Sequence, residues 1–387
     1  MANGPELKNG KTIAGGNGPA TELRPQGPLK ILIAGGGTGG HLFPGLAIAQ
    51  AFAAKDPCNS IVFVSIGNAL EQSILSKKGF ELKQIRVEGF KQRGVFNQVK
   101  ALLKIPPGIF QSIRIIKKFR PDLVIGVGSY AAGPVAAAAW LLGVKIVLHE
   151  QNILPGLTNR MLAGIADRIY VSFKNPPAFF SPAKTRITGN PVRSEILHAA
   201  GPGREKKQAF TVLIIGGSQG AHSINMAITD ALQHIPDRDR FFFIHQTGTK
   251  DLDKVTQAYR ENRMSGKIRA FFSDMAQPYS LADLIVCRAG ATTVAEVTAL
   301  GKAVIFIPFP FAADNHQVLN ARILSDGGAA ETILENDLNG RLLAQRIRYY
   351  EEHPRQLAGM AGRAAGLGHP DAAEDIVMDC YRLLAGC

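Results

Sequence analysis

One motif occurs twice in this chain, and it narrows the possible folds to a single class. The segments KILIAGGGTGGH (residues 30–41) and TVLIIGGSQGAH (residues 211–222) lie 181 residues apart. Each combines an apolar run, a glycine-rich turn and a residue that can open a helix. In parallel α/β sheets, a buried strand leads into its helix through such a turn. The repeat therefore predicts two Rossmann-like domains in tandem.

Further apolar runs alternate with helical segments along the chain. Continuous apolar strands separated by helices indicate parallel sheets with both faces covered, and right-handed crossovers then give doubly wound α/β domains. We expect strands at 30–34, 60–65, 123–127, 145–149, 168–171, 211–215, 241–246, 268–272, 284–287 and 303–307.

The chain of 387 residues is long enough for two domains. Residues 1–28 hold 6 Gly and 4 Pro without an apolar stretch, which predicts a flexible tail and no signal peptide, and hence a cytoplasmic protein. We divide the remainder into a first domain (29–193), a linker (194–210), a second domain (211–355) and a helical segment (356–387) that could return to the first domain.

Residues 123–144 carry no charge over 22 residues, which is about the length of a membrane span. Four glycines and one proline interrupt this stretch, at positions 126, 128, 133, 134 and 143. A buried strand, a glycine-rich turn and an alanine-rich helix over 135–142 fit it better than a transmembrane helix does.

The formal net charge of +13 favours an anionic partner. Residues 83–120 hold ten Lys and Arg but one acid, Glu88, so most of the excess lies there. Apolar residues recur in this segment at helical spacing, which suits an anionic membrane surface. An ordinary helix with its apolar face in the core remains an alternative. No RNA-binding signature accompanies the charge, so we expect no nucleic acid partner. The predicted membrane residues are Phe96, Val99, Lys100, Leu103 and Lys104.

Several cofactor classes are disfavoured. The four cysteines form no CxxC pair, and no HxxH or HExxH motif is present, so we expect no metal site and no disulfide scaffold. The first glycine turn lacks the GK[ST] of a P-loop. The strand after it ends at Gly67 with no acid before Glu71, which argues against nicotinamide binding. The sequence therefore predicts no cofactor.

Three turns at strand ends suit an anionic ligand. Residues 35–40, 216–221 and 288–293 are rich in small residues and precede helices, whose N-terminal N–H groups attract phosphate. Such a turn is also simply how a strand meets a helix. Glu296 lies one turn into the third helix, where its carboxylate suits two ribose hydroxyls or merely complements the helix dipole. Asp314, Asn315 and Gln317 follow the next strand and suit sugar hydroxyls or a solvated loop.

Two candidate general bases follow strands of the first domain. His41 opens the helix after the first turn, and Glu150 stands in the segment HEQN at a strand end. Because carboxyl ends of parallel strands gather at one rim, both side chains can face one cleft. A histidine at a helix start is also often a cap or a packing residue.

The strings GGGTGGHLFPGLAIA, GSYAAGP, HEQNILPGLTN, GNPVR, GGSQGA, SDM, RAGATTVAE and DNHQVLNA occur in this order between residues 35 and 321. Together they resemble the MurG family of bacterial peptidoglycan glycosyltransferases, in glycosyltransferase family 28. The resemblance implies the GT-B fold, in which the two domains face each other across a cleft. It also implies an inverting enzyme that moves N-acetylglucosamine from UDP-N-acetylglucosamine (UDP-GlcNAc) to the muramyl 4-hydroxyl of lipid I, giving lipid II and UDP in cell-wall synthesis.

The resemblance also assigns roles to residues. It places His41 as the base for the acceptor hydroxyl, the first glycine turn near the acceptor pyrophosphate, and the basic segment on the cytoplasmic face of the inner membrane. At Phe272 the family often has Ile, so a backbone contact to uracil is the better expectation there. The implied UDP-GlcNAc contacts are Thr38, Gly39, Gly40, Asn152, Arg193, Ser218, Gln219, Phe272, Ala291, Thr292, Thr293, Val294, Ala295, Glu296 and Gln317.

Other functions stay open on the residues alone. A UDP-GlcNAc 2-epimerase or a glycolipid synthase would use the same fold and a UDP-sugar. A membrane-binding or nucleic-acid-binding protein without catalysis would use the basic segment and have no affinity for UDP-sugars.

Overall fold

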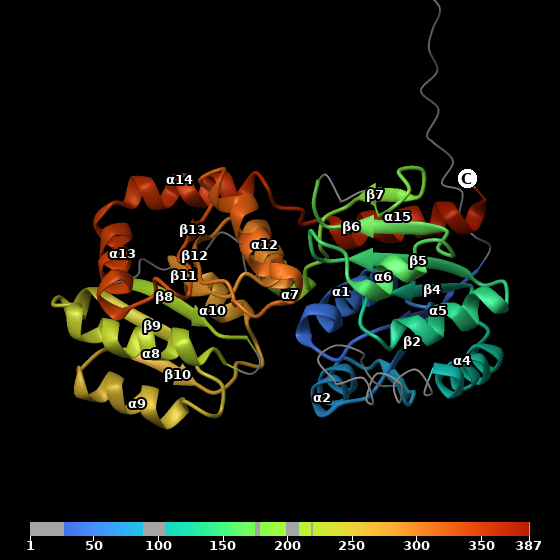
Figure 1. Ribbon diagram of the computed structural model, residues 1–387, viewed down its shortest axis with the longest axis horizontal. Helices are drawn as coiled ribbons and strands as arrows, with labels where there is room; N and C mark the ends of the chain where they lie inside the picture. The colour runs from blue at the N-terminus through green and yellow to red at the C-terminus, as the bar shows by residue number, and fades with distance from the viewer. Residues whose placement is uncertain (1–26, 88–104, 175–178, 199–208, 218–219, 387) are drawn as a thin grey trace, which may run out of the picture.

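The computed structural model describes residues 27–87, 105–174, 179–198, 209–217 and 220–386, which form two α/β domains (Figure 1). The first sheet has seven strands in the order β3-β2-β1-β4-β5-β6-β7, and the second has six in the order β10-β9-β8-β11-β12-β13. All paired strands are parallel. The prediction of two doubly wound parallel sheets is confirmed.

In the first domain the strands are β1 (Lys30–Ala34), β2 (Ser60–Ser65), β3 (Glu81–Gln84), β4 (Leu123–Gly126), β5 (Lys145–Glu150), β6 (Arg168–Val171) and β7 (Thr185–Ile187). The helices are α1 (Gly39–Lys55), α2 (Ala69–Lys77), α4 (Ile105–Phe119), α5 (Ala132–Leu141) and α6 (Leu157–Leu162). Helix α7 (Ser194–His198) follows this sheet in sequence but packs with the second domain.

In the second domain the strands are β8 (Phe210–Ile215), β9 (Phe241–Gln246), β10 (Gly266–Arg269), β11 (Leu284–Cys287), β12 (Ala303–Phe306) and β13 (Glu331–Thr332). The α-helices are α8 (His222–Ala231), α9 (Leu252–Glu261), α10 (Ala276–Leu281), α11 (Ala291–Ala299), α12 (His316–Ser325), α13 (Gly340–Glu352) and α14 (Pro354–Ala365), after which α15 (Ala372–Ala385) returns to the first domain. Short 3-10 helices are η1 (Leu232–His234), η2 (Arg238–Arg240) and η3 (Ala313–Asn315).

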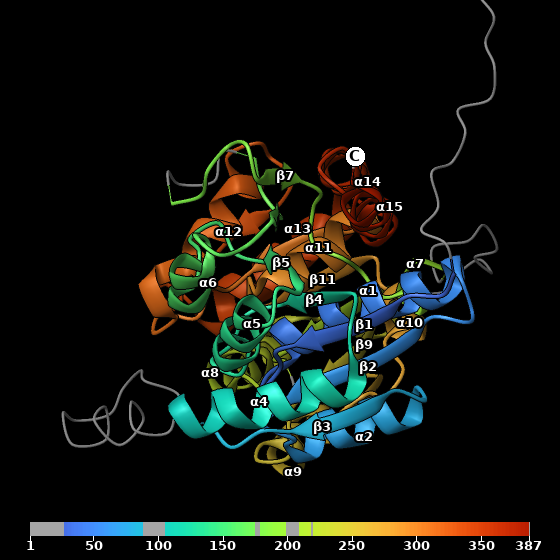
Figure 2. The same ribbon diagram turned by 90° about the vertical axis from the view of Figure 1, so that its right-hand side faces the viewer.

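Burial on both faces explains why the central strands are apolar throughout. In β1, Leu32 packs toward a cluster that includes α5, while Ile31 and Ile33 pack toward one that includes α1 and α15. Helices α4 and α5 lie side by side over the first of these faces (Figure 2). Ile33 pairs in register with Phe63 of β2 and Ile125 of β4, so β1 is central in its sheet.

The predicted strand at 268–272 is wrong in its limits, because β10 spans Gly266–Arg269. Its partner β9 ends at Gln246, opposite Arg269, so the ladder stops there. The short strands β3, β7 and β13 were not predicted. They lie toward the sheet edges and are only partly buried, so they lack a continuous apolar run.

The uncharged stretch at 123–144 forms β4 and α5, as predicted, although α5 begins three residues earlier than expected. Within the described part of the chain, we find no helix whose length and apolar character would let it cross a membrane.

The last two helices belong to different domains. Met360 and Ala364 of α14 are buried in cores of the second domain. Helix α15 instead packs against α1, and its Ile376 is fully buried beside the first sheet (Figure 1). The hydroxyl of Tyr170 in β6 donates to the Asp379 carboxylate at 2.9 Å. The chain therefore crosses between the domains twice, near residues 188–193 and again near 366–371.

Candidate functional site

Two helix N-termini meet between the domains. Helix α1 starts after Thr38 and α11 after Gly290, and among the described residues no side chain caps either helix. The hydroxyl of Thr292 donates to the carbonyl oxygen of Gly40 at 3.3 Å, so the two ends face one another. Uncapped helix N-termini present free N–H groups and a partial positive charge. This junction is therefore suited to an anion.

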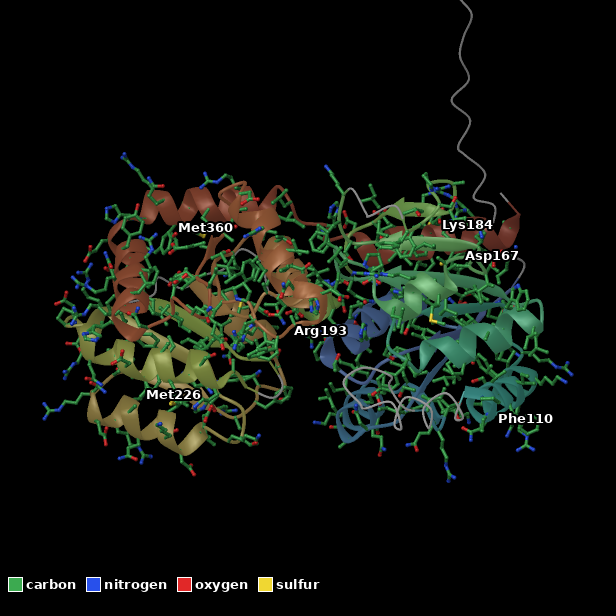
Figure 3. All side chains as sticks on the ribbon, in the orientation of Figure 1. Phe110, Asp167, Lys184, Arg193, Met226 and Met360 are labelled. Atoms are coloured by element: carbon green, nitrogen blue, oxygen red, sulfur yellow. The ribbon has the colours of Figure 1, made fainter. Side chains whose placement is uncertain are left out.

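Arg193 lies at the same junction, on the border between the domains (Figure 3). Its side chain is buried, and its Nη2 donates to Oε1 of Glu296 at 2.9 Å. Its guanidinium carbon lies 3.9 Å from the centre of the Phe43 ring in α1. Its buried Nε has no hydrogen-bond partner among the described residues.

The second carboxylate oxygen of Glu296 is also occupied. Oε2 accepts a hydrogen bond from the Tyr279 hydroxyl at 2.7 Å. Burial, reinforced by the Glu296 charge, raises the pKa of Tyr279 well above its ordinary value, so the phenol stays protonated and donates. Glu296 is thus fixed on one side of α11, and each of its oxygens keeps a lone pair for a further donor.

His41 is held through one ring nitrogen. Its Nδ1 lies 3.0 Å from the carbonyl oxygen of Val127 and 3.1 Å from Oε1 of Gln151. Both partners accept hydrogen bonds, so Nδ1 carries the proton and the lone pair is on Nε2. Gly128, at φ +88°, leaves room for this ring, because a Cβ atom there would lie 2.8 Å from Nδ1. The geometry gives His41 the tautomer that a general base needs.

A second, fully buried histidine supports the same arrangement. Nε2 of Gln151 lies 3.0 Å from Nδ1 of His149, and Nε2 of His149 lies 3.3 Å from the Gly189 carbonyl oxygen. Burial lowers the pKa of His149 to about 4, although the Gly189 carbonyl opposes this shift. His149 is therefore neutral near pH 7 and accepts from Gln151. Sequence reasoning missed Gln151 and His149, although both stand in the HEQN segment.

Glu150 has a different environment from His41. Its carboxylate is buried and accepts hydrogen bonds from the backbone N–H groups of Asn152 and Gly156, at 3.0 and 2.9 Å. The side-chain amide of Asn159 donates to it as well, at 2.8 Å. These contacts fix the loop after β5, and the structure does not bring Glu150 into contact with His41.

Glu71 has a structural role that the sequence analysis did not predict. It is buried beneath the first glycine turn, where its Oε1 accepts from the Gly37 N–H at 2.6 Å and its Oε2 from the Asn68 N–H at 2.8 Å. A Cβ atom on Gly36 would lie 2.0 Å from Oε1, so glycine is required there. The protein's own carboxylate thus occupies part of the first turn.

Gln246 joins parts of the second domain. Its Oε1 accepts from the backbone N–H of Phe272 at 2.9 Å, and its Nε2 donates to the Gly217 carbonyl at 3.0 Å. The Phe272 side chain is buried, and its backbone N–H is already paired with Gln246, so only its carbonyl oxygen is left for the predicted backbone contact to uracil. Gln246 had no signal in the sequence beyond its position at a strand end.

The remaining residues that were predicted to contact UDP-GlcNAc follow strand ends of the two sheets. Oε1 of Gln317 accepts from the Phe309 N–H at 3.0 Å. Next to Asn152, the backbone N–H of Ile153 points to Oδ1 of Asn320 across the domain border, at 3.5 Å. Asp314 and Asn315 both have positive φ, at 53° and 52°, a strained conformation that is common at functional sites.

Several predicted residues lie outside the described part of the chain: Ser218, Gln219, Phe96, Val99, Lys100, Leu103 and Lys104. Among the residues that are described, no group of three or more His, Cys, Asp or Glu side chains could hold a metal ion.

Comparison with known proteins shows which family this chain belongs to. Residues 31–171 match the glycosyltransferase family 28 N-terminal domain, and residues 211–376 match the glycosyltransferase family 28 C-terminal domain. The UDP-N-acetylglucosamine–N-acetylmuramyl-(pentapeptide) pyrophosphoryl-undecaprenol N-acetylglucosamine transferase of Syntrophus aciditrophicus is 45% identical over 92% of this chain and 99% of its own length. The protein with the same description from Geobacter sulfurreducens is 46% identical over 90% of this chain and 97% of its own.

A solved structure agrees with these sequence relatives. The crystal structure of Acinetobacter baumannii MurG is similar with a TM-score of 0.72 and 30% identity, over 92% of this chain and all of that one. The predicted GT-B architecture is thereby confirmed.

The buried state of His149 leads to a prediction about pH. Because its pKa is lowered from 6.5 to about 4, the unfolded chain binds a proton between these pH values and the folded chain does not. The free energy of unfolding should therefore fall as the pH drops from 6.5 to 4, by about 3 kcal/mol from this group. In urea unfolding, the difference between wild type and His149→Gln should shrink by that amount over this range.

The same replacement at exposed His353 controls for the general effect of removing an imidazole. A difference between wild type and His149→Gln that does not change with pH would contradict a neutral, buried His149.

Proposed function

The chain belongs to the MurG family within glycosyltransferase family 28, and we propose on this premise that it transfers N-acetylglucosamine from UDP-GlcNAc to lipid I, giving lipid II and UDP. The observation that carries the proposal is the junction of two uncapped helix N-termini beside Arg193. A diphosphate leaving group develops negative charge as the sugar departs, and fixed N–H groups and a guanidinium stabilise that charge. The proposed reaction uses no metal or other cofactor.

We propose that His41 is the general base. The muramyl 4-hydroxyl attacks the anomeric carbon of N-acetylglucosamine while the bond from that carbon to the UDP oxygen breaks, which inverts the configuration. The hydroxyl proton passes to Nε2 of His41, and the electron pair of the broken bond leaves with UDP. The Nδ1 contacts to Val127 and Gln151 support this role, since they leave the Nε2 lone pair available.

Gln151 and Glu150 act as positioning residues in this proposal. Gln151 receives the Nδ1 hydrogen bond, and neutral His149 holds Gln151 in the orientation that allows it. Glu150, predicted as a second candidate base, instead holds the loop that carries Asn152. Its three hydrogen-bond donors support that role better than proton abstraction.

The donor contacts are proposed on the second domain and the helix junction. Glu296 would accept the ribose hydroxyls, and the diphosphate would draw Arg193 from Glu296 to itself. The Phe272 backbone would meet uracil, and Gln317 the transferred sugar. The other residues assigned to UDP-GlcNAc are Thr38, Gly39, Gly40, Asn152, Ser218, Gln219 and the start of α11 from Ala291 to Ala295.

We propose that residues 29–193 bind the acceptor and residues 211–355 bind the donor. The first crossing lies just before the predicted linker of residues 194–210, because α7 at the start of that linker packs with the second domain. The site takes groups from α1 and α11, which already touch through the Thr292–Gly40 hydrogen bond, so we propose that the domains open to admit UDP-GlcNAc and close on it again. The two chain crossings are the segments that would bend.

A membrane-facing surface is proposed on α4 and α5, which would place the enzyme peripherally on the cytoplasmic face of the inner membrane. Phe110, Trp140 and Leu141 are 55%, 57% and 59% exposed on these neighbouring helices. Arg114 lies over the Phe110 ring at 4.3 Å, and α4 ends in Lys117 and Lys118. Exposed apolar side chains beside cations suit an anionic lipid surface.

One assay separates the proposed transferase from an epimerase on the same fold. UDP release from UDP-GlcNAc should require a lipid I analogue, and His41→Ala should lower kcat by about 10²-fold or more, because general base catalysis contributes on that scale. UDP release at the same rate without the acceptor would support the epimerase instead. Full turnover by His41→Ala would remove His41 from the role of base.

The positioning role of Gln151 predicts a change in the pH profile. In Gln151→Glu, a carboxylate beside the imidazole of His41 favours the protonated ring, so the acid limb of kcat/KM should move to higher pH by about one unit. Gln151→Leu is the matched control, since it removes the hydrogen bond without adding charge and should lower kcat without this shift. Identical profiles for the two variants would argue against the proposed contact.

For donor binding, we expect Glu296→Ala to weaken UDP-GlcNAc affinity about tenfold or more, because hydrogen bonds to a charged carboxylate are lost. Isothermal titration calorimetry measures this directly. Glu331→Ala is the control, as it breaks a carboxylate–arginine pair with Arg346 away from the site. An unchanged affinity of Glu296→Ala for UDP-GlcNAc would contradict the proposed contact between Glu296 and the ribose.

The proposed membrane surface predicts weaker vesicle binding when its apolar side chains are removed. The double variant Trp140→Ser and Leu141→Ser should lower partitioning onto phosphatidylglycerol vesicles about tenfold or more. Leu334→Ser, at an exposed leucine of the second domain, is the control. Equal partitioning of the double variant and the control would place the membrane contact elsewhere.

A further inference from the structure

Gln246 stands where two loops of the second domain leave the sheet. It is the last residue of β9 and pairs in register with the last residue of β8, Ile215, on one side and with the last residue of β10, Arg269, on the other. The second glycine turn (residues 216–221) starts directly after Ile215, and Phe272 follows Arg269 by three residues. A side chain at this position can therefore reach both loops.

The Gln246 side chain points to the face of the sheet that carries α10 and α11. Successive residues of a strand alternate between the two faces. Ile244 packs in the core cluster that contains Tyr279 of α10, so Gln246 lies on the same face. His245, between them, points to the other face, where it contacts Asn225 of α8. Gln246 is thus on the side of the sheet where the donor contacts are proposed.

Both ends of the Gln246 amide are used. Its Oε1 accepts a hydrogen bond from the Phe272 N–H at 2.9 Å, and its Nε2 donates to the Gly217 carbonyl oxygen at 3.0 Å. A backbone N–H can pair only with the oxygen of an amide, and a carbonyl only with its nitrogen, so these contacts fix which way the amide points. Because Gln246 is only 4% exposed, the Phe272 N–H is held inward, away from solvent.

Backbone contacts hold the two loops only up to the peptides that Gln246 binds. The pairing of the β9 and β10 segments continues to Ala270, whose carbonyl oxygen accepts from the Gly248 N–H at 3.0 Å. The far end of the glycine turn packs on Thr247, because a Cβ atom on Gly220 would lie 2.2 Å from the Thr247 carbonyl oxygen. Neither contact fixes the direction of the Phe272 peptide, which the Gln246 amide does.

We propose that Gln246 is a positioning residue that sets the base specificity of the donor site. The inference rests on the proposed contact between the Phe272 backbone and uracil. With its N–H held by Gln246, the peptide can offer the base only its carbonyl oxygen, which accepts and does not donate. N3 of uracil carries a hydrogen and can donate to this oxygen, whereas N3 of cytosine has a lone pair and cannot. The bond to Gly217 keeps the Phe272 loop at a fixed distance from the second glycine turn.

Binding of UDP and of CDP to the full chain tests this role without the transferase reaction. The two ligands share the ribose and the diphosphate, so the ratio of their affinities reports on the base contact. In isothermal titration calorimetry we expect wild type to bind UDP about tenfold or more tightly than CDP, because a site built to accept an N–H rejects a ligand that lacks it.

Two variants separate the two contacts of the amide. Gln246→Leu removes both hydrogen bonds and frees the Phe272 N–H, so the affinity for UDP should fall about tenfold and the preference for UDP over CDP to about threefold or less. Gln246→Glu keeps an oxygen for the Phe272 N–H but has no donor for Gly217, so both nucleotides should bind more weakly while the preference remains. Gln257→Leu, at an exposed glutamine of α9, is the matched control and should behave as wild type.

The preference compares two ligands on one variant, so it does not depend on the fraction of the protein that is folded. A merely structural role of Gln246 predicts that Gln246→Leu weakens UDP and CDP equally, and that result overturns the proposal. Loss of the preference in Gln246→Glu overturns it as well, since the contact to Phe272 is kept there. Equal affinities of wild type for UDP and CDP overturn this inference and leave the transferase standing, whereas no binding of UDP to wild type contradicts the proposed function itself.

Discussion

The rest of this structure depends on the meeting of two positively polarised helix ends. The N-termini of α1 and α11 face each other across the domain border, joined by the Thr292–Gly40 hydrogen bond. Two such ends repel when nothing lies between them, and an anion between them converts the repulsion into attraction. The buried pair of Arg193 and Glu296 also lies there, so a cation is already present. In the proposed reaction, the charges that attract the diphosphate would therefore also draw the two domains together.

The path of the chain keeps this junction movable but connected. α7 and α14 pack with the second domain, whereas α15 returns to pack against α1. Each crossing is a few residues long, so only two short segments of backbone connect the domains. A buried hydrogen bond from His149 to Gly189 anchors the first crossing to the strand β5. The network that orients His41 thus ends at the first crossing, so the proposed closure would link the position of the proposed base to the angle between the domains.

The sequence predicts the fold well because the decisive strands are buried on both faces. Short apolar runs such as 30–34 and 284–287 are typical of strands that are buried on both faces. Strand β13 has two partly buried residues, so no apolar run marks it in the sequence. The site is less predictable from sequence. His41 and Arg193 stand in recognisable motifs, but Glu71 and Gln246 act through contacts between segments 34 and 29 residues apart. Such contacts depend on the packing of strands and turns, which local pattern does not specify.

The internal repeat shows that a histidine after a glycine turn is not sufficient to identify a general base. His41 and His222 occupy equivalent places after the two glycine turns. His222 is largely exposed, and its Nδ1 lies 2.9 Å from Oδ1 of Asp251. Nδ1 of His41 instead contacts a backbone carbonyl oxygen and a side-chain amide oxygen, which hold the ring in one orientation and are both uncharged. Both domains also bury a neutral histidine, and burial lowers the pKa of His245 to about 3. In the second domain that histidine contacts Asn225 beside the glycine turn, so the same device serves to hold a loop there.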